Sequence, residues 1–468
     1  IDKAGFEPLR PELDRIAAIT DRETLLATAA HLQYIGVSPL LRVAIMQDAK
    51  QSDVNAVYLW QGGLGLPDRD YYFDDDARTK SVRAEYVKHV ANMLKLLGDD
   101  ATTATAGAAT VMRIETNLAR ASRKLEDLRD PQRNYNKMTL DEATKLTPTV
   151  RWRHFLEESK IDHIDSVIVG QPEFLQQLNK TLQKESLADW KAYLRWQLVH
   201  EYATALSAPF EQENFRFYGT VLSGTPDQRP RWKRMLDEED TYLGEALGQL
   251  YVRDYFGPAA KARYEDLTNE IFVAFADRIR ALDWMSPETR QAALRKLAAV
   301  TKKVGYPDKW KDYSSYEVDG RSFAGNVMRG HAWQSDYAIA KLHKPVDRTE
   351  WDMTPQTYNA YYNPSNNEIV LPAAIFALPG VRDEDLDDAI IYGYAGGTTI
   401  GHELTHGFDD EGRQFDEQGN LREWWNAKDV ELFKQRAQDI VKQFNQYEVV
   451  DGLHVNGNAT QGENIADL

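Results

Sequence analysis

The chain has 468 residues, of which 42% are hydrophobic and 28% charged, as is usual for a globular protein with a large core and two or three domains. Its formal net charge of −17 disfavours nucleic acid and anionic membrane surfaces as partners. It contains no cysteine, which excludes disulfides and thiolate metal ligands and fits the cytosol or a bacterial periplasm. No apolar run approaches the length of a transmembrane helix, so no membrane span is predicted.

Residues 1 to about 280 are predicted to be mostly helical. Apolar residues recur at three- and four-residue spacing in five segments, each of which predicts a helix: 10–41, 75–97, 108–128, 172–206 and 238–282. A further helix is predicted to begin after Ser286, because serine is a good N-cap and Pro287 suits the first helical position.

The helical pattern stops around residue 310, and a strand pattern follows from residue 350 on. Two short runs rich in Tyr, Ile and Val, 357–362 and 368–372, flank the turn-forming cluster 363–367, which predicts a hairpin. An extended peptide could pair with the backbone of such a strand. The later predicted elements are a helix over 426–447, a small strand or hairpin over 449–455, and the start of a helix over 460–468.

Between these elements the sequence reads His-Glu-Leu-Thr-His, an H-E-x-x-H motif. Residues four apart share one helical face, so His402 and His406 can direct two imidazole nitrogens at one metal ion. Glu403 projects beside the same site, where a carboxylate can act on a metal-bound water. A catalytic zinc takes three protein ligands, and Glu463 is the candidate for the third. Asp467, four residues further on, is placed to accept the second ring N–H of a ligating histidine.

The alternative to a metal site is a solvated helix with two surface histidines. The apolar and small residues of segment 389–397 lead into the motif and predict that it lies on a buried helix. Histidine and glutamate are costly to bury unless they are paired or bind a metal, so this context and the distal glutamate favour the metal site. Three other histidines lack ligand spacing and are predicted to be packed or surface residues: His331, His343 and His454.

The motif is one of several segments that together indicate a protein family. They are Tyr358-Asn359-Ala360-Tyr361-Tyr362, residues 401–410, Trp424-Trp425 and residues 462–468, supported by residues 65–72, 129–131, 231–233 and 305–310. Together they resemble the neprilysin and endothelin-converting-enzyme family of zinc metallopeptidases, with the bacterial oligopeptidase O branch the most similar. The resemblance runs across almost the whole chain.

This resemblance implies a mainly α, two-domain enzyme. A thermolysin-like catalytic domain, of which residues 341–468 are the N-terminal part, would be covered by a mostly helical lid domain with linkers, residues 1–340. The two would enclose a cavity that admits short peptides and excludes folded proteins. The implied site residues are the ligands of one Zn²⁺ per chain, His402, His406 and Glu463, the general base Glu403, the histidine partners Asp467 and Asp409, and Asn359 with the Ala360 backbone for the substrate main chain.

The resemblance also implies that this chain lacks both the N-terminal beginning of the family and its C-terminal portion. That missing C-terminal segment of the same protein is expected to be a partner of the chain. A bacterial protein is expected, with a periplasmic or secreted location favoured and a cytoplasmic location left open.

The motif chemistry predicts a zinc-dependent endopeptidase that hydrolyses short peptides by attack of a zinc-bound water, with Glu403 as general base. One alternative is a non-catalytic peptide-binding relative with a structural zinc, against which the intact ligand set and the intact glutamate speak. Another is an open-cleft thermolysin-like protease that degrades proteins. The long helical region before the motif favours a lid instead.

Overall fold

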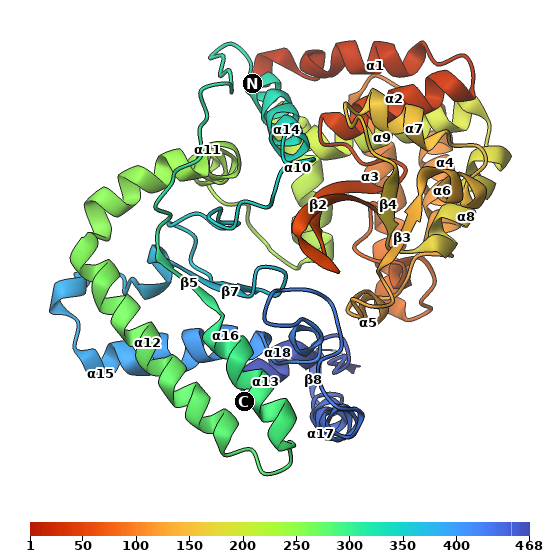
Figure 1. Ribbon diagram of the computed structural model, residues 1–468. Helices are drawn as coiled ribbons and strands as arrows, with labels where there is room; N and C mark the ends of the chain where they lie inside the picture. Colours follow the sequence, from red (N-terminus) through yellow and green to blue (C-terminus); the bar gives the residue numbers. More distant parts are fainter. Residues whose placement is uncertain (451) are drawn as a thin grey trace.

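The computed structural model describes residues 1–450 and 452–468, which form two domains (Figure 1). One hydrophobic core draws mainly on residues between Leu9 and Phe217, and a second draws on residues between Val252 and Leu404. The fold is mainly α, as predicted. The helices of the first domain are α1 (Arg10–Ala17), α2 (Arg22–Tyr34), α3 (Ala77–Leu96), α4 (Ala101–Ala119), α5 (Leu125–Leu128), α6 (Leu140–Leu146), α7 (Trp152–Glu158), α8 (Pro172–Lys184), α9 (Leu187–Tyr202) and α10 (Ala208–Asn214).

Two of the predicted long helices are each divided by a capping residue. The side chain of Asp21 accepts a hydrogen bond from the backbone N–H of Thr24 and starts α2, so the predicted helix over 10–41 is interrupted. In the same way Ser186 caps α9 by accepting from the backbone N–H of Asp189. Apolar periodicity continues across both breaks because the consecutive helices bury residues in the same core.

A four-stranded sheet in the first domain was not predicted. Its order is β1-β2-β4-β3, with β1 antiparallel to β2, β2 parallel to β4, and β3 antiparallel to β4. Prediction failed because β1 is mostly half-exposed and β2 is continuously buried only over residues 57–59, so neither shows a clear two-residue alternation. The strands are β1 (Arg42–Asp48), β2 (Gln51–Trp60), β3 (Asn136–Thr139) and β4 (Ser166–Val169).

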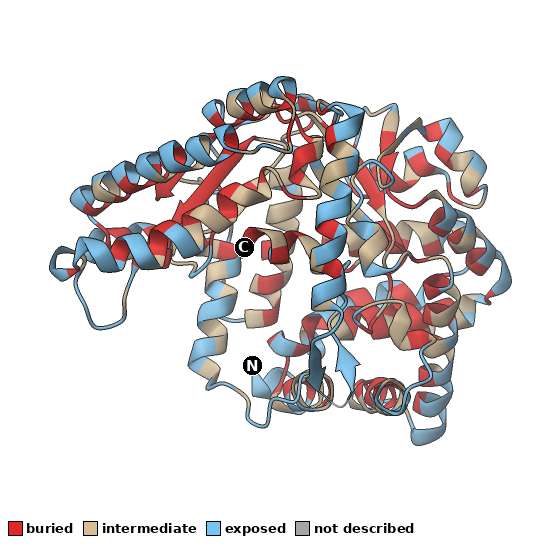
Figure 2. Cartoon of the chain, turned by 90° about the horizontal axis from the view of Figure 1, so that it is seen from below, coloured by how far each residue is buried: buried red, intermediate tan, exposed pale blue. Residues whose placement is uncertain are grey.

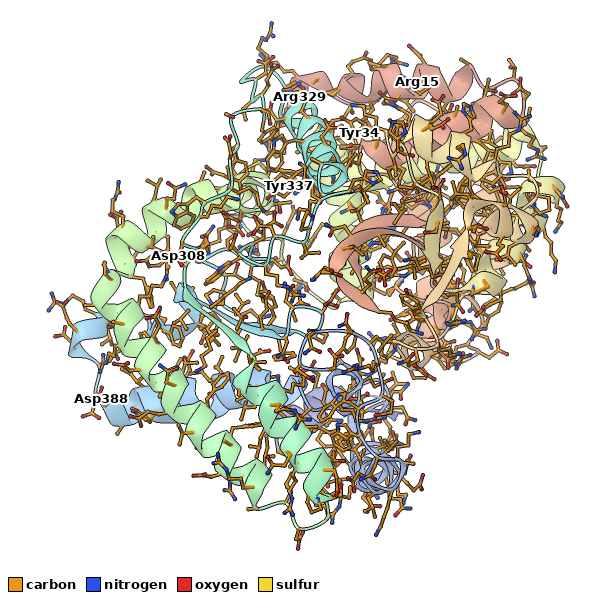
Figure 3. The ribbon with its side chains drawn as sticks, in the orientation of Figure 1. Arg15, Tyr34, Asp308, Arg329, Tyr337 and Asp388 are labelled. Carbon is orange, nitrogen blue, oxygen red and sulfur yellow. The ribbon has the colours of Figure 1, made fainter. Side chains whose placement is uncertain are left out.

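The β1–β2 turn contacts the second domain. The backbone N–H of Ser52 donates to Oδ1 of Asn420 at 2.9 Å, and its hydroxyl donates to the backbone oxygen of Gln418 at 2.8 Å. Helix α14 packs against the first core, and Tyr34 of α2 donates its hydroxyl hydrogen to Asp336 of α14 at 2.9 Å. Figure 3 labels Tyr34 beside this helix. The next helices in the chain are α11 (Arg231–Tyr255), α12 (Pro258–Arg280), α13 (Pro287–Ala298) and α14 (Phe323–Ile339), of which α12 and α13 pack in the second core.

The second domain contains a three-stranded sheet of order β5-β7-β6. The predicted hairpin is confirmed, since β6 and β7 pair antiparallel with Tyr361 opposite Val370. All five residues of β7 are buried, and β6 is an edge strand. Figure 2 colours buried residues red and shows exposed residues along the outer sides of the helices. The remaining elements are β5 (Thr301–Gly305), β6 (Tyr361–Asn363), β7 (Glu368–Pro372), α15 (Asp388–Ile391), α16 (His402–His406), α17 (Ala427–Phe444), β8 (Glu448–Val450), β9 (Leu453–His454) and α18 (Gln461–Ala466).

Several helices and strands lie in the segments where the sequence predicted them. Ser286 caps α13 as predicted, and α17 and α18 occupy the predicted helical segments. β8 and β9 form the predicted small hairpin, within which residue 451 lies outside the described residues. The predicted helix over 238–282 is divided between α11 and α12, where Gly257 is followed by Pro258.

The hydrophobic core around the metal motif is built from residues of several separate parts of the sequence. It includes residues of α11, α12, α13 and β5 as well as residues after 360. The domain boundary at residue 340 stays a prediction. Residues 252–304, which precede that boundary, pack in the second core. Across the described residues, no helix has both the length and the apolarity needed to cross a membrane.

Candidate metal centre

The H-E-x-x-H motif forms α16, which continues the helical segment of α15 and a π-helical stretch, Tyr392–Gly401. The prediction of a buried helix is wrong for this segment. Ala395 and Ile400 are buried, whereas Ile390 is 51% exposed and Tyr392 is 43% exposed. One side of the segment packs on α12, where Gly396 lies beside Leu267 and Ile271. Other apolar residues of the segment, such as Ile390, face solvent.

The three predicted ligands meet at one point. Nε2 of His402 and Nε2 of His406 are 3.1 Å apart. Oε2 of Glu463 lies 3.3 Å from the first nitrogen and 3.6 Å from the second. Glu463 comes from α18, fifty-seven residues after the motif, and no other set of three His, Asp or Glu side chains in the described residues offers ligand atoms that converge this closely.

The hydrogen bonds at the other ring nitrogens indicate what these atoms can bind. Nδ1 of His402 is 2.8 Å from Asp467, and Nδ1 of His406 is 2.8 Å from Asp409. Because a carboxylate only accepts, each Nδ1 carries the hydrogen and each Nε2 presents a lone pair. Two lone pairs and a carboxylate oxygen then face one another, an arrangement that a cation stabilises. The donor set of two imidazoles and one carboxylate suits a catalytic zinc.

Asp409 and Asp467 hold their histidines in different surroundings. Asp409 is 4% exposed, and its Oδ1 accepts from the backbone N–H groups of Glu411 and Gly412 at 2.9 and 2.7 Å. Its other oxygen is therefore fixed toward the ring of His406. The side chain of Asp467 is 73% exposed, so water competes for its bond to His402. Asp467, suggested by its spacing from Glu463, and Asp409, implied by the family resemblance, each contact one histidine, and the buried Asp409 is the more firmly oriented.

Glu403 is buried beside the two histidines, with 8% exposure. Burial raises the pKa of its carboxyl group, an effect that the two neighbouring histidines oppose. A carboxyl group whose pKa is raised toward neutrality is a suitable general base. Together with the ligands, Glu403 lines a pocket of about 350 Å³.

The same pocket is lined by Asn359 and Ala360, the residues expected to hold a substrate main chain. Asn359 is exposed and Ala360 is buried, directly before the edge strand β6. A larger hollow of about 710 Å³ lies around residues 251–260 and 373–386, and it is lined by none of the metal-motif side chains. The three other histidines noted in the sequence do not line the metal-centre pocket.

Sequence reasoning missed Lys296, which fixes the turn after the metal helix. Its ammonium group, on α13, is fully buried and donates to the backbone oxygens of Gly407, Gly412 and Phe415 at 2.6, 2.7 and 2.8 Å. Burial lowers the pKa of Lys296 to about 7, while the nearby Asp409 carboxylate opposes that shift. In the sequence the only signal was a lysine within the apolar pattern of α13.

Comparison with known proteins identifies the family. Models of peptidase family M13 match residues 1–307 and residues 359–468. The chain belongs to peptidase family M13. This M13 chain is 35% identical over 442 residues to an endothelin-converting enzyme homolog of Locusta migratoria, covering 91% of the chain and 60% of the relative. It is 33% identical over 458 residues to endothelin-converting enzyme 1 of Rattus norvegicus, covering 95% of the chain and 59% of that relative.

Solved bacterial structures share the two-domain fold of this M13 chain. The Mycobacterium tuberculosis zinc metalloprotease Zmp1 in complex with an inhibitor is 38% identical, with a TM-score of 0.94 over 100% of this chain and 71% of the other. PepO from Lactobacillus rhamnosis is 27% identical, with a TM-score of 0.90 over 100% of this chain and 74% of the other. The predicted family is confirmed, and these relatives support the expected bacterial origin. The chain spans about 60% of the length of the curated relatives it matches.

Proposed function

We propose that the protein is a zinc-dependent endopeptidase that hydrolyses short peptides at the centre formed by His402, His406 and Glu463. The observation that carries this proposal is the convergence of their three ligand atoms within 4.8 Å of one another, with both Nδ1 atoms already bonded to carboxylates. Membership of family M13 supports the same reaction class.

Each residue of the pocket would have a defined task. One Zn²⁺ bound there would lower the pKa of a coordinated water and polarise the scissile carbonyl. Glu403 would take the proton of the attacking water and deliver it to the leaving amine nitrogen. Asp409 and Asp467 would keep the two imidazoles in the Nδ1–H tautomer, so that Nε2 stays available to the metal.

Substrate binding is proposed to use the edge of the second-domain sheet. The outer edge of β6 carries backbone groups that can pair with an extended peptide, and Asn359 with the Ala360 backbone lies at its start. A peptide aligned there would place its scissile bond toward Glu403, which lines the same pocket.

The decisive experiment for the general base is Glu403→Gln. Glutamine preserves size but cannot take up the proton, so zinc should still bind while turnover falls by about 10²–10⁴-fold. Peptide hydrolysis by the variant at the parent rate would reject the assigned role. An excess of chelator should also abolish cleavage by the parent, and readded zinc should restore it.

The same assays separate the alternatives. A non-catalytic peptide-binding relative with a structural zinc would bind peptide but cleave none, with or without chelator. An open-cleft protease would degrade casein, whereas we expect cleavage of a ten-residue peptide and no digestion of casein. A periplasmic or secreted location is proposed from the bacterial relatives, and fractionation of cells producing the protein would test it.

A further inference from the structure

Arg129 lies in the first domain, directly after α5, and reaches across to the metal centre of the second domain. Its Nη2 is 3.2 Å from each carboxylate oxygen of Asp410 and 3.0 Å from Oε1 of Glu411. These two acidic residues directly follow Asp409, whose carboxylate binds the ring of His406. Arg129 is therefore in direct contact with the loop that orients one of the ligating histidines.

The same guanidinium also touches the segment that carries the third ligand. A Cβ atom added at Gly462 would lie 2.5 Å from Nη2 of Arg129 and 2.9 Å from Oδ2 of Asp409, so no larger residue fits there without a shift. Gly462 immediately precedes Glu463 on α18. Arg129 thus contacts both the loop after the metal helix and the start of α18, the two segments that must meet to complete the metal centre.

Asn134 holds the backbone of the loop that presents Arg129. The side-chain amide of Asn134 donates to the backbone oxygens of Asp127, Leu128 and Asp130 at 2.9, 3.2 and 2.7 Å. These three carbonyl groups surround Arg129 in the sequence. The backbone of the loop is consequently fixed on both sides of the arginine.

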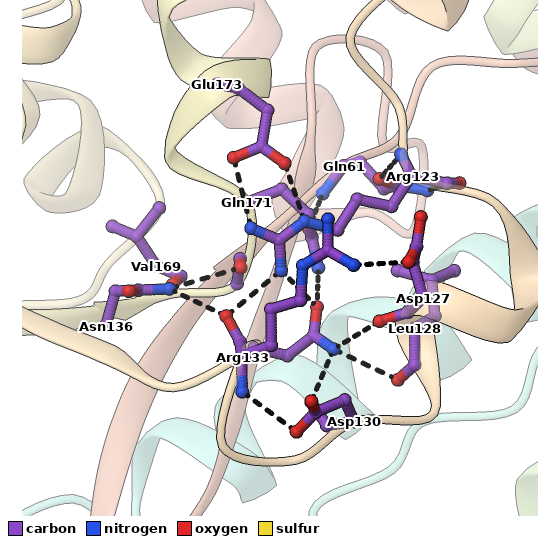
Figure 4. Close-up of polar contacts among 12 residues, drawn as sticks. Gln61, Arg123, Asp127, Leu128, Asp130, Arg133, Asn136, Val169, Gln171 and Glu173 are labelled. Carbon is purple, nitrogen blue, oxygen red and sulfur yellow. Dashed lines mark hydrogen bonds and ion pairs between the residues drawn. The ribbon is translucent and has the colours of Figure 1, made fainter.

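Asn134 is in turn anchored to the body of the first domain. Its Oδ1 accepts from Nη1 of Arg123 at 3.0 Å and from Nε2 of Gln171 at 2.8 Å. Arg123, with only 9% side-chain exposure, makes a two-point ion pair with Glu173 on α8, at 2.6 and 3.1 Å (Figure 4). The first domain therefore positions the backbone of Arg129.

Charge explains why a cation is needed at this position. Asp409, Asp410 and Glu411 are consecutive, and Asp409 and Arg129 both lie beside Gly462, the residue before Glu463. Negative charges that repel one another therefore gather at this place. A fork-shaped guanidinium can contact several carboxylate oxygens at once, which a point-like ammonium does less well. Arg129 supplies that cation from outside the second domain.

We propose that Arg129 is a positioning residue for the metal centre: from the first domain, it holds the Asp409–Glu411 loop and the start of α18 together so that Glu463 meets the two histidines. The inference rests on the proposed function, because it requires a metal at those ligands. It makes the affinity of the centre for zinc depend on the docking of the two domains.

Zinc affinity of the metal-free protein, measured by competition with a chromogenic chelator, tests this role without measuring catalysis. The variant is the double substitution Arg129→Met with Asp410→Asn, which removes the link but leaves the net charge near the metal unchanged. We expect its affinity for zinc to fall by about tenfold, the lower end of the effect of removing outer partners of metal ligands. The matched control is Arg133→Met with Asp127→Asn, an ion pair within the same loop whose two side chains contact each other; its affinity should stay at the parent value.

An affinity of the double variant within twofold of the parent, or an equal loss in the control, would overturn the proposal. Circular dichroism and thermal unfolding verify that each variant is folded. If the double variant does not fold, Arg129→Lys replaces it, and its ammonium should give a smaller loss of affinity, about threefold, because it forms fewer contacts; an unchanged affinity would overturn the role of the arginine. Failure of the parent to bind zinc would instead refute the proposed function.

Discussion

Replacing Lys296 by methionine tests how the turn after the metal helix is held. Methionine keeps most of the side-chain volume but removes the donor that the backbone oxygen of Gly407 has now. The oxygens of Gly412 and Phe415 also lose the ammonium, but they keep the backbone N–H of Phe415 and the indole N–H of Trp424 as donors. A buried acceptor that loses its partner costs about 1–3 kcal/mol. Burial of the ammonium itself costs free energy, as its lowered pKa shows, and methionine removes that cost. We therefore take the lower end of the range for the Gly407 carbonyl, about 1 kcal/mol, as the net loss.

Differential scanning calorimetry of the metal-free protein measures this loss. For a domain of roughly 200 residues, about 1 kcal/mol corresponds to a decrease in Tm of about 2–4 °C. The matched control is Lys302→Met on β5, where the exposed ammonium bonds to Asn269, and its Tm should change by less than about 2 °C. Equal shifts in the two variants, or an unchanged Tm for Lys296→Met, would refute the reasoning that the Gly407 carbonyl depends on this ammonium.

Three further outcomes are expected. The pKa of Lys296 is about 7 in the folded state, below its value of 10.5 in the unfolded chain, so the unfolded state binds more protons between these values and stability rises with pH there. Calorimetry at pH 7.5 and pH 9 should therefore show the stability difference between the parent and Lys296→Met widening, by up to about 1.4 kcal/mol per pH unit; a constant difference would contradict this. Asp409→Asn should weaken zinc binding by about 10–100-fold in chelator competition, and Asp467→Asn, at an exposed position, by less than about threefold; equal losses would contradict the contrast in burial. Removal of zinc by chelator should lower the Tm of the second domain, since saturation at about 100 times Kd contributes about 2.7 kcal/mol, and an unchanged Tm would argue against a metal in the native state.

The metal ligands could be predicted because their geometry follows from local rules. Two histidines four residues apart share a helical face whatever the rest of the chain does, and a catalytic zinc needs a third ligand. The cap at Ser286 and the hairpin of β6 and β7 were predictable for the same reason, since each depends on a few neighbouring residues.

The rest depends on contacts between distant segments. Arg129 and Asp410 are 281 residues apart in the sequence, so no local pattern joins them. Lys296 lies within a helical pattern in which a lysine is normally exposed, and only the fold shows that it is buried. The segment before the motif was predicted to be buried because its composition is apolar, but which of its faces packs against α12 is decided by tertiary structure. β1 and β2 were missed because only part of each strand is buried.

The account depends on one divalent cation held jointly by His402, His406 and Glu463. Anomalous diffraction at the zinc absorption edge, from crystals of the protein grown with zinc, tests this most directly. We predict a single peak per chain, about 2.0–2.2 Å from Nε2 of both histidines and from a carboxylate oxygen of the glutamate. A peak bound by the histidines with Glu463 turned away, or no peak between the three side chains, would contradict the account.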